Sequence, residues 1–111
     1  MAKTPREQRK HPRVPVQFRS HFSSRGQMIA GDGELKDLSP GGCRIHTGVE
    51  APVGTRLEVC LFSHPEAAPL LVDEAIVRWV QPGSIGLEFS QVRAEPRRRL
   101  LDLCRRLAPI T

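Results

Sequence analysis

The fold of this chain is organised around one short stretch, DLSPGG, which spans residues 37–42. Asp and Ser hydrogen-bond to nearby backbone, Pro fixes φ, and Gly reaches φ > 0 without a Cβ clash, so the stretch predicts a compact turn. Asp37 and Ser39 are two residues apart, so in an extended entry both point to one face and Leu38 to the other. We therefore expect Leu38 to anchor in the core, while Asp37 and Ser39 offer acceptors and a hydroxyl outward. Taken alone, the stretch also fits an ordinary glycine-rich hairpin turn with an Asx-type cap.

A basic segment, RKHPR at residues 9–13, precedes the first apolar run. A guanidinium group is a planar fork that matches phosphate or a guanine edge bidentately and stacks on bases. In an extended segment Arg9 and Arg13 lie roughly 13 Å apart, a span that suits the two ends of a small dinucleotide. The same spacing recurs at Arg93 and Arg97, so spacing alone is a weak signal. The alternative is a disordered basic tail.

Composition and length indicate one small domain with a single core. The chain has 111 residues, 39% of them hydrophobic, and no apolar run approaches the roughly 18 residues of a membrane span. We expect a cytoplasmic protein whose three cysteines, Cys43, Cys60 and Cys104, are reduced and mostly buried.

The formal charge of +5 comes from the ends of the chain, since residues 1–13 and 93–111 each carry +4 and the middle carries −3. If the two ends of the chain meet on one face, they form a positively charged opening for a phosphate ligand. If they do not, the basic residues at 93–111 are the solvated face of a helix.

Apolar residues alternate with polar ones along most of the chain. In the first run Val14, Val16 and Phe18 point inward, whereas Gln17 and Arg19 point outward. Gly residues 31 and 33 suggest a bulge or a sharp bend at a barrel corner. Several short strands with turn signals between them favour a closed or partly closed all-β fold. The expected strands are 14–22, 27–35, 43–46, 55–62, 70–80 and 85–89.

The last part of the chain has helical periodicity instead. Leu100, Leu103, Cys104 and Leu107 fall at i, i+3, i+4 and i+7, which predicts a helix at about 95–107 with one apolar stripe. We expect this stripe to pack over one opening of the barrel. Alternatively, it is a dimer or partner surface.

No motif indicates catalysis or a resident metal. The four histidines (His11, His21, His46 and His64) are widely spaced and form no metal-ligand pattern with the cysteines. Walker, Gly-x-Ser-x-Gly and His-Glu-x-x-His motifs are lacking in the sequence. The single tryptophan, Trp79, could stack on a base, although a lone strand Trp is more often core or barrel rim. We expect no enzyme, no metal and no cofactor.

Taken together and in this order, these residues resemble the PilZ domain family. The family pattern is Arg-x-x-x-Arg in an N-terminal arm, followed by Asp/Asn-x-Ser-x-x-Gly, and here it reads Arg9, Arg13, Asp37, Ser39 and Gly42. The flanking runs AIVRWV at 75–80 and IGLEF at 85–89 resemble its closing strands. The resemblance implies a six-stranded antiparallel β-barrel at 14–111 with a C-terminal helix, preceded by a flexible basic arm at 1–13. It also implies that the ligand is the bacterial second messenger cyclic di-GMP.

The resemblance assigns roles to individual residues. Asp37 and Ser39 would hold a guanine edge, whose adjacent N–H groups suit a carboxylate. Gly41 and Gly42 would admit the ligand closely, and the two arginines of the arm would bind phosphate and guanine. Auxiliary contacts are expected from Gln8, Lys10 and Trp79. Ligand binding would then order the arm and create a surface for a separate output protein, since the sequence shows no output domain.

Two other functions remain open from the sequence. One is a protein-interaction adaptor that does not bind the nucleotide. The other is a small β-barrel that binds single-stranded nucleic acid, which is disfavoured because tyrosine is absent and aromatic residues make up only 5%. We expect a monomer or weak dimer.

Overall fold

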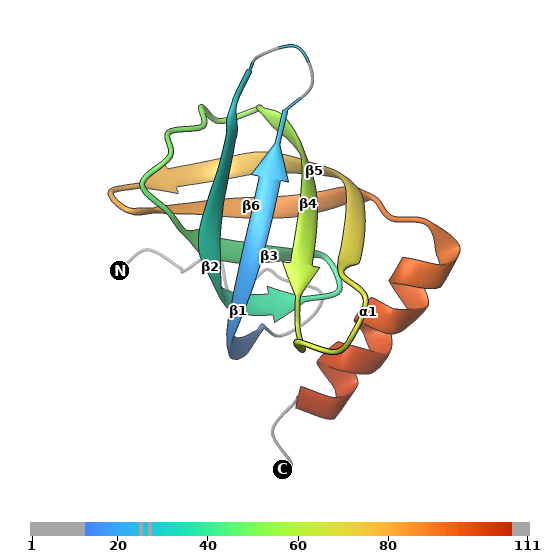
Figure 1. Ribbon diagram of the computed structural model, residues 1–111. Helices are drawn as coiled ribbons and strands as arrows, with labels where there is room; N and C mark the ends of the chain where they lie inside the picture. Colours follow the sequence, from blue (N-terminus) through green and yellow to red (C-terminus); the bar gives the residue numbers. More distant parts are fainter. Residues whose placement is uncertain (1–12, 25, 27, 108–111) are drawn as a thin grey trace, which may run out of the picture.

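The computed structural model describes residues 13–24, 26 and 28–107, which form six strands and one helix (Figure 1). The strands form a closed barrel in the order β1-β2-β3-β6-β5-β4, with every neighbouring pair antiparallel. The expectation of a six-stranded antiparallel barrel with a C-terminal helix is therefore confirmed. The elements are β1 (Val14–Ser23), β2 (Ala30–Ser39), β3 (Gly42–His46), β4 (Arg56–Phe62), β5 (Leu70–Gln81), β6 (Ser84–Gln91) and α1 (Ala94–Leu107).

The alternation predicted from the sequence places the core. On β1, Val14 and Phe22 are buried, whereas Arg19 and His21 are exposed. The inner faces of the other strands supply mainly Leu, Val and Ile. Because period-two alternation puts one face of each strand inside, closing the sheet gathers these faces into one core. Its largest fully buried side chains are Phe22, Leu35, Leu38, Ile45, Leu57, Leu61, Leu70, Ile85, Leu87, Leu100, Val59 and Val72.

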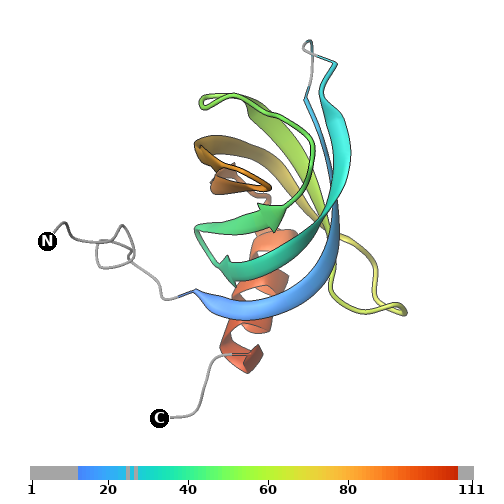
Figure 2. The ribbon, with the colours of Figure 1, turned by 90° about the vertical axis from the view of Figure 1, so that its left-hand side faces the viewer.

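Helix α1 adds its apolar stripe to this core. Leu100 is fully buried and Cys104 is 7% exposed, and Leu103 packs at the edge of the same cluster. The last member of the predicted stripe, Leu107, is 38% exposed, so it does not pack inside as expected. The helix contacts β5 and β2 (Figures 1 and 2). Asp73 on β5 accepts a hydrogen bond from the backbone N–H of Arg93 at 3.1 Å, which fixes the start of the helix.

The boundaries of the central turn differ from the prediction. Asp37, Leu38 and Ser39 belong to β2 and Gly42 opens β3, so only Pro40 and Gly41 form the turn. A two-residue connection suits an antiparallel hairpin, and it lets the ladder run through most of the motif.

The predicted bulge at the glycines of β2 is wrong. Gly31 and Gly33 pair in regular register with Phe22 and Ser20, and the irregularity facing β3 lies between Leu35 and Asp37. The glycines are needed for space, since a Cβ on Gly31 would lie 2.5 Å from the Val49 side chain and one on Gly33 would clash with Ile45.

The three thiols are free, with Cys43 and Cys104 buried and Cys60 half-buried. Within residues 13–24, 26 and 28–107, no helix is long and apolar enough to cross a membrane. The predicted arm residues Gln8, Arg9 and Lys10 lie outside the described residues.

Candidate functional site

A cluster of three charged side chains lies where β1 begins and β2 ends. Arg13 Nη1 is 3.0 Å from Asp37 Oδ1, and Arg44 Nε is 3.2 Å from Asp37 Oδ2. Both carboxylate oxygens of Asp37 are therefore engaged by a guanidinium. The Arg13 and Asp37 side chains are only 14% and 20% exposed, whereas Arg44 is 45% exposed. Partial burial makes this charge cluster stronger than an ordinary surface ion pair.

Strand pairing explains why residues so distant in sequence meet here. Pro15 on β1 lies opposite Asp37, which places the preceding Arg13 next to that carboxylate. On its other side Asp37 lies opposite Arg44 of β3. Side chains directly opposite each other on one face of a sheet are within contact distance, so the register itself forms the cluster.

Arg13 is not fully satisfied in this position. Its Nε atom is buried and has no hydrogen-bond partner among the residues that the structure describes. A buried donor without an acceptor costs roughly 1–3 kcal/mol. The Arg13 side chain thus has free energy to gain if an additional acceptor, such as a phosphate oxygen, comes within reach.

Ser39 holds the turn rather than pointing outward. It is 5% exposed, its Oγ accepts a hydrogen bond from the Gly41 backbone N–H at 3.2 Å, and the hydroxyl donates to the Gly42 carbonyl at 3.4 Å. The expectation that Ser39 offers its hydroxyl to solvent is therefore wrong for this structure. The reason is that Ser39 ends β2, where its side chain can satisfy the backbone of the turn.

The two glycines of the motif differ from each other. A Cβ on Gly42 would collide with the Leu87 carbonyl oxygen on β6 and lie 3.5 Å from Arg13 Nη2. A Cβ on Gly41 would meet nothing within 4 Å. Neither glycine has a positive φ, so Gly42 is required by close strand contact, and Gly41 leaves open space beside the turn.

Trp79 lies in the same cross-strand row as the charge cluster. Asp37 pairs with Arg44, Arg44 pairs with Gly86 of β6, and Gly86 pairs with Trp79 of β5. The Trp79 ring covers Gly86, where any Cβ would overlap the indole. With neighbouring strands about 4.8 Å apart, the backbones of Trp79 and Arg44 lie roughly 10 Å apart. The half-buried indole, which covers Gly86, lies nearer to Arg44.

Cys43 lies beneath the cluster and is inert. Burial raises the pKa of its thiol well above the ordinary value, and the nearby Asp37 adds to the rise while Arg13 opposes it. A thiol with such a raised pKa is a poor nucleophile. It serves as a small apolar residue in the core.

The structure thus brings Arg13, Asp37, Gly42 and Ser39 together and places Trp79 in line with them. Sequence reasoning missed Arg44. Alternation predicts that Arg44 points outward from its strand, but only the register shows that it shares the Asp37 carboxylate. Among the residues that the structure describes, no group of three or more His, Cys, Asp or Glu side chains could hold a metal.

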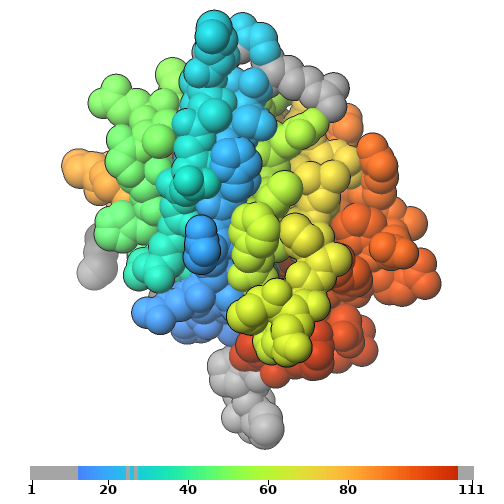
Figure 3. All heavy atoms as spheres, in the orientation of Figure 1, coloured from blue at the N-terminus to red at the C-terminus, as the bar shows by residue number. Residues whose placement is uncertain are grey.

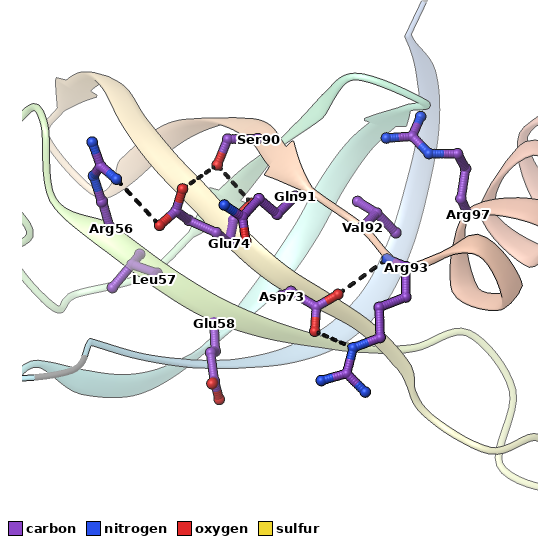
Figure 4. Close-up of a pocket in the computed structure, with 10 residues that line it drawn as sticks. All are labelled: Arg56, Leu57, Glu58, Asp73, Glu74, Ser90, Gln91, Val92, Arg93 and Arg97. Carbon is purple, nitrogen blue, oxygen red and sulfur yellow. Dashed lines mark hydrogen bonds and ion pairs between the residues drawn. The ribbon is translucent and has the colours of Figure 1, made fainter.

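A separate pocket of about 640 Å³ is lined by residues of β4, β5 and β6, of the connection to α1 and of the first turn of α1 (Figure 4). It contains none of the candidate residues named above. Its lining comprises Arg56, Leu57, Glu58, Asp73, Glu74, Ser90, Gln91, Val92, Arg93 and Arg97.

Comparisons with known proteins agree with this geometry. The PilZ domain family model matches residues 7–106. Among solved structures, the chain is similar to the PilZ domain of CeSA from a cellulose-synthesizing bacterium, with 15% identity, a TM-score of 0.69, and coverage of 86% of this chain and 96% of that one. It is also similar to the Bacillus subtilis inhibitor of motility MotI/DgrA, with 20% identity, a TM-score of 0.71, and coverage of 88% of this chain and 49% of that one.

At these identities the two structural matches support the fold alone. No curated protein sequence matches the chain. The family match, in contrast, extends over nearly the whole chain and includes both sequence motifs. The chain therefore belongs to the PilZ domain family, a family of cyclic di-GMP-binding domains.

Proposed function

We propose that this protein is a cyclic di-GMP receptor whose binding site is the Arg13–Asp37 cluster together with the arm at residues 1–13. The observation that carries the proposal is the convergence of Arg13, Asp37 and Gly42, which lie far apart in the sequence. These are positions of the family's two motifs. Further support comes from the Nε group of Arg13, which lacks an acceptor among the described residues.

The chemistry of each group fits a part of the ligand. The Asp37 carboxylate can accept hydrogen bonds from the adjacent N–H groups of guanine, provided that it shares or exchanges its arginine partners. Arg13 can then turn toward a phosphate, where its buried N–H gains an acceptor. Trp79 offers a face for a purine ring, on which stacking is worth about 1–3 kcal/mol.

The N-terminal arm completes the proposed mechanism. Arg9, which lies outside the described residues, would bind the ligand together with Arg13 and hold the arm against the barrel. The surface formed in this way would be read by a separate partner protein. If the ligand binds one arrangement of the arm more tightly than the others, it shifts the population of the arm toward that arrangement. The size of the shift is set by the difference in affinity.

Site variants test the assignment. Replacing Arg9 or Arg13 with Ala should weaken cyclic di-GMP binding about 5- to 150-fold, because each removes a contact worth roughly 1–3 kcal/mol. Asp37→Ala should weaken it in the same range, since it removes the acceptor oxygens for the guanine N–H groups. Arg19→Ala is the matched control, because Arg19 is exposed on β1 and forms no ion pair within the described part of the chain.

Isothermal titration calorimetry measures the cyclic di-GMP affinity of each variant, and circular dichroism confirms that each variant is folded. Unchanged affinity in both arm variants would refute the role of the arm. Affinity lost equally in Arg19→Ala would show that general positive charge, and not this site, attracts the ligand.

A further inference from the structure

The exposed side of α1 carries arginines without partners. Arg97, Arg98 and Arg105 are exposed and form no ion pair with any residue that the structure describes. Other arginines on or beside the helix are engaged: Arg93 pairs with Asp73 at 3.1 Å and Arg106 with Asp102 at 3.2 Å. The three guanidinium groups thus face solvent on one side of the helix, which also carries the exposed carboxylates Glu95 and Asp102.

These arginines surround an exposed leucine. Leu101 is 39% exposed and lies four residues after Arg97, three after Arg98 and four before Arg105. Residues at these spacings share one face of a helix. The neighbouring face of the helix, which carries Leu100 and Cys104, is buried in the barrel, so Leu101 is an apolar side chain that stays partly accessible beside the arginines. Figure 3 shows α1 open to solvent along one edge of the molecule.

The pocket adjoins this face at the N-terminal end of the helix. Arg97 is one of its lining residues. Of the three pocket carboxylates, Asp73 and Glu74 are paired with Arg93 and Arg56 (Figure 4), and Glu58 is engaged as well. An incoming carboxylate would therefore meet the free guanidinium of Arg97 without displacing an existing pair. The pocket also offers apolar lining from Leu57 and Val92.

The chemistry of this surface selects among possible partners. An anionic membrane would find no apolar helix face to insert, because that face is buried in the barrel. A single-stranded nucleic acid would find no stacking platform, since the helix sequence AEPRRRLLDLCRRL contains no aromatic residue. Guanidinium forks match carboxylates bidentately, and a central apolar residue within a polar rim is the usual form of a protein interface.

We propose that the exposed side of α1, with Arg97, Arg98, Leu101 and Arg105, and the adjoining pocket bind an acidic, leucine-containing segment of a partner protein. The acidic side chains pair with the three arginines, and a leucine of the segment contacts Leu101. This surface shares no residue with the Arg13–Asp37 cluster. It is therefore independent of whether the protein binds cyclic di-GMP.

The test is a titration of the ¹⁵N-labelled full-length protein with a synthetic twelve-residue peptide of Glu and Asp with two leucines, followed by NMR. Amide shifts should concentrate on α1 and the pocket rim. Arg98→Glu should weaken binding at least about tenfold, as expected from losing a paired charge and gaining a repulsive one. Arg19→Glu, which makes the same change in net charge on β1, should change it less than about twofold. Leu101→Ala should weaken it to an intermediate degree.

Three results would overturn the proposal. Equal losses in Arg98→Glu and Arg19→Glu would show attraction by net charge alone. Shifts centred on Asp37 and Arg44 would place the peptide at the other site. Tighter binding of a poly-uridine twelve-mer, or of phosphatidylserine vesicles, would mean that the partner is not a protein segment. Calorimetry with cyclic di-GMP on the same samples separates this proposal from the receptor proposal, since either can fail while the other holds.

Discussion

Gly42 links the stability of the barrel to the geometry of the site. Its missing side chain lets β3 approach the Leu87 carbonyl of β6 and leaves room for the Arg13 guanidinium. Gly41, its neighbour, has open space around it. The motif thus contains two different glycines: strand packing requires Gly42, whereas it does not require Gly41.

This contrast gives a stability prediction. Gly42→Ala should destabilise the protein by about 1–3 kcal/mol, because the new methyl group forces two strands apart. Gly41→Ala should leave stability within about 0.5 kcal/mol or raise it slightly, since its φ is ordinary and Ala lowers the entropy of the unfolded chain. Thermal unfolding followed by circular dichroism measures both. Equal melting temperatures for the two variants would contradict the strand-contact explanation.

The cysteines give a second prediction, on reactivity. Burial raises the pKa of Cys104 to about 11 and that of Cys43 further still, while that of Cys60 is raised by partial burial and by the Glu58 carboxylate. At pH 8 every thiol is therefore mostly protonated, and exposure decides the order of reaction. A thiol reagent should modify Cys60 first, and Cys43 and Cys104 only when the protein unfolds. Rapid reaction of all three in the folded protein would contradict the burial described.

Single residues also show what the sequence can and cannot predict. Burial of Leu38 follows from the period-two alternation, which is local and visible in the sequence. The ion-pair partners of Asp37 and the inward position of Ser39 cannot be predicted from this alternation. They depend on which residue of a neighbouring strand lies opposite. That register is set by the closure of the barrel and by bulges such as the one between Leu35 and Asp37.

Among the elements, α1 has two faces with different tasks. Leu100 belongs to the core cluster, whereas Leu101 points away from it and is 39% exposed. The apolar spacing of the helix was sufficient to predict its buried stripe. The free arginines opposite could not be distinguished from paired ones until the positions of Asp73 and Asp102 were known.

Two adjacent leucines test this division. Leu100→Ala should destabilise the protein by about 2–5 kcal/mol, the usual cost of a cavity in a packed core. Leu101→Ala should cost less than about 0.5 kcal/mol, as is typical of surface substitutions. Urea unfolding monitored by Trp79 fluorescence reports both free energies. A large loss in Leu101→Ala would show that this side of α1 is part of the fold and not a free surface.

For the barrel as a whole, closure places two separate polar surfaces on one small domain. The Arg13–Asp37 cluster lies at the β2–β3 hairpin, and the arginines lie on the exposed side of α1, which packs against β5 and β2. The positive charge seen at both chain ends thus has two different environments: Arg13 is paired with a carboxylate, while three arginines of the helix remain unpaired among the described residues. This arrangement suits a domain that receives a small anionic ligand at one surface and a protein at another.

The most direct test of the central claim is calorimetric titration of the folded wild-type protein with cyclic di-GMP, beside GTP and cyclic di-AMP. The receptor proposal predicts binding at micromolar or lower dissociation constant that is selective for cyclic di-GMP, since the Asp37 carboxylate favours a guanine edge and the two arginines favour a ligand with two phosphates. Absence of binding at modest salt, or equal binding of all three nucleotides, would contradict it.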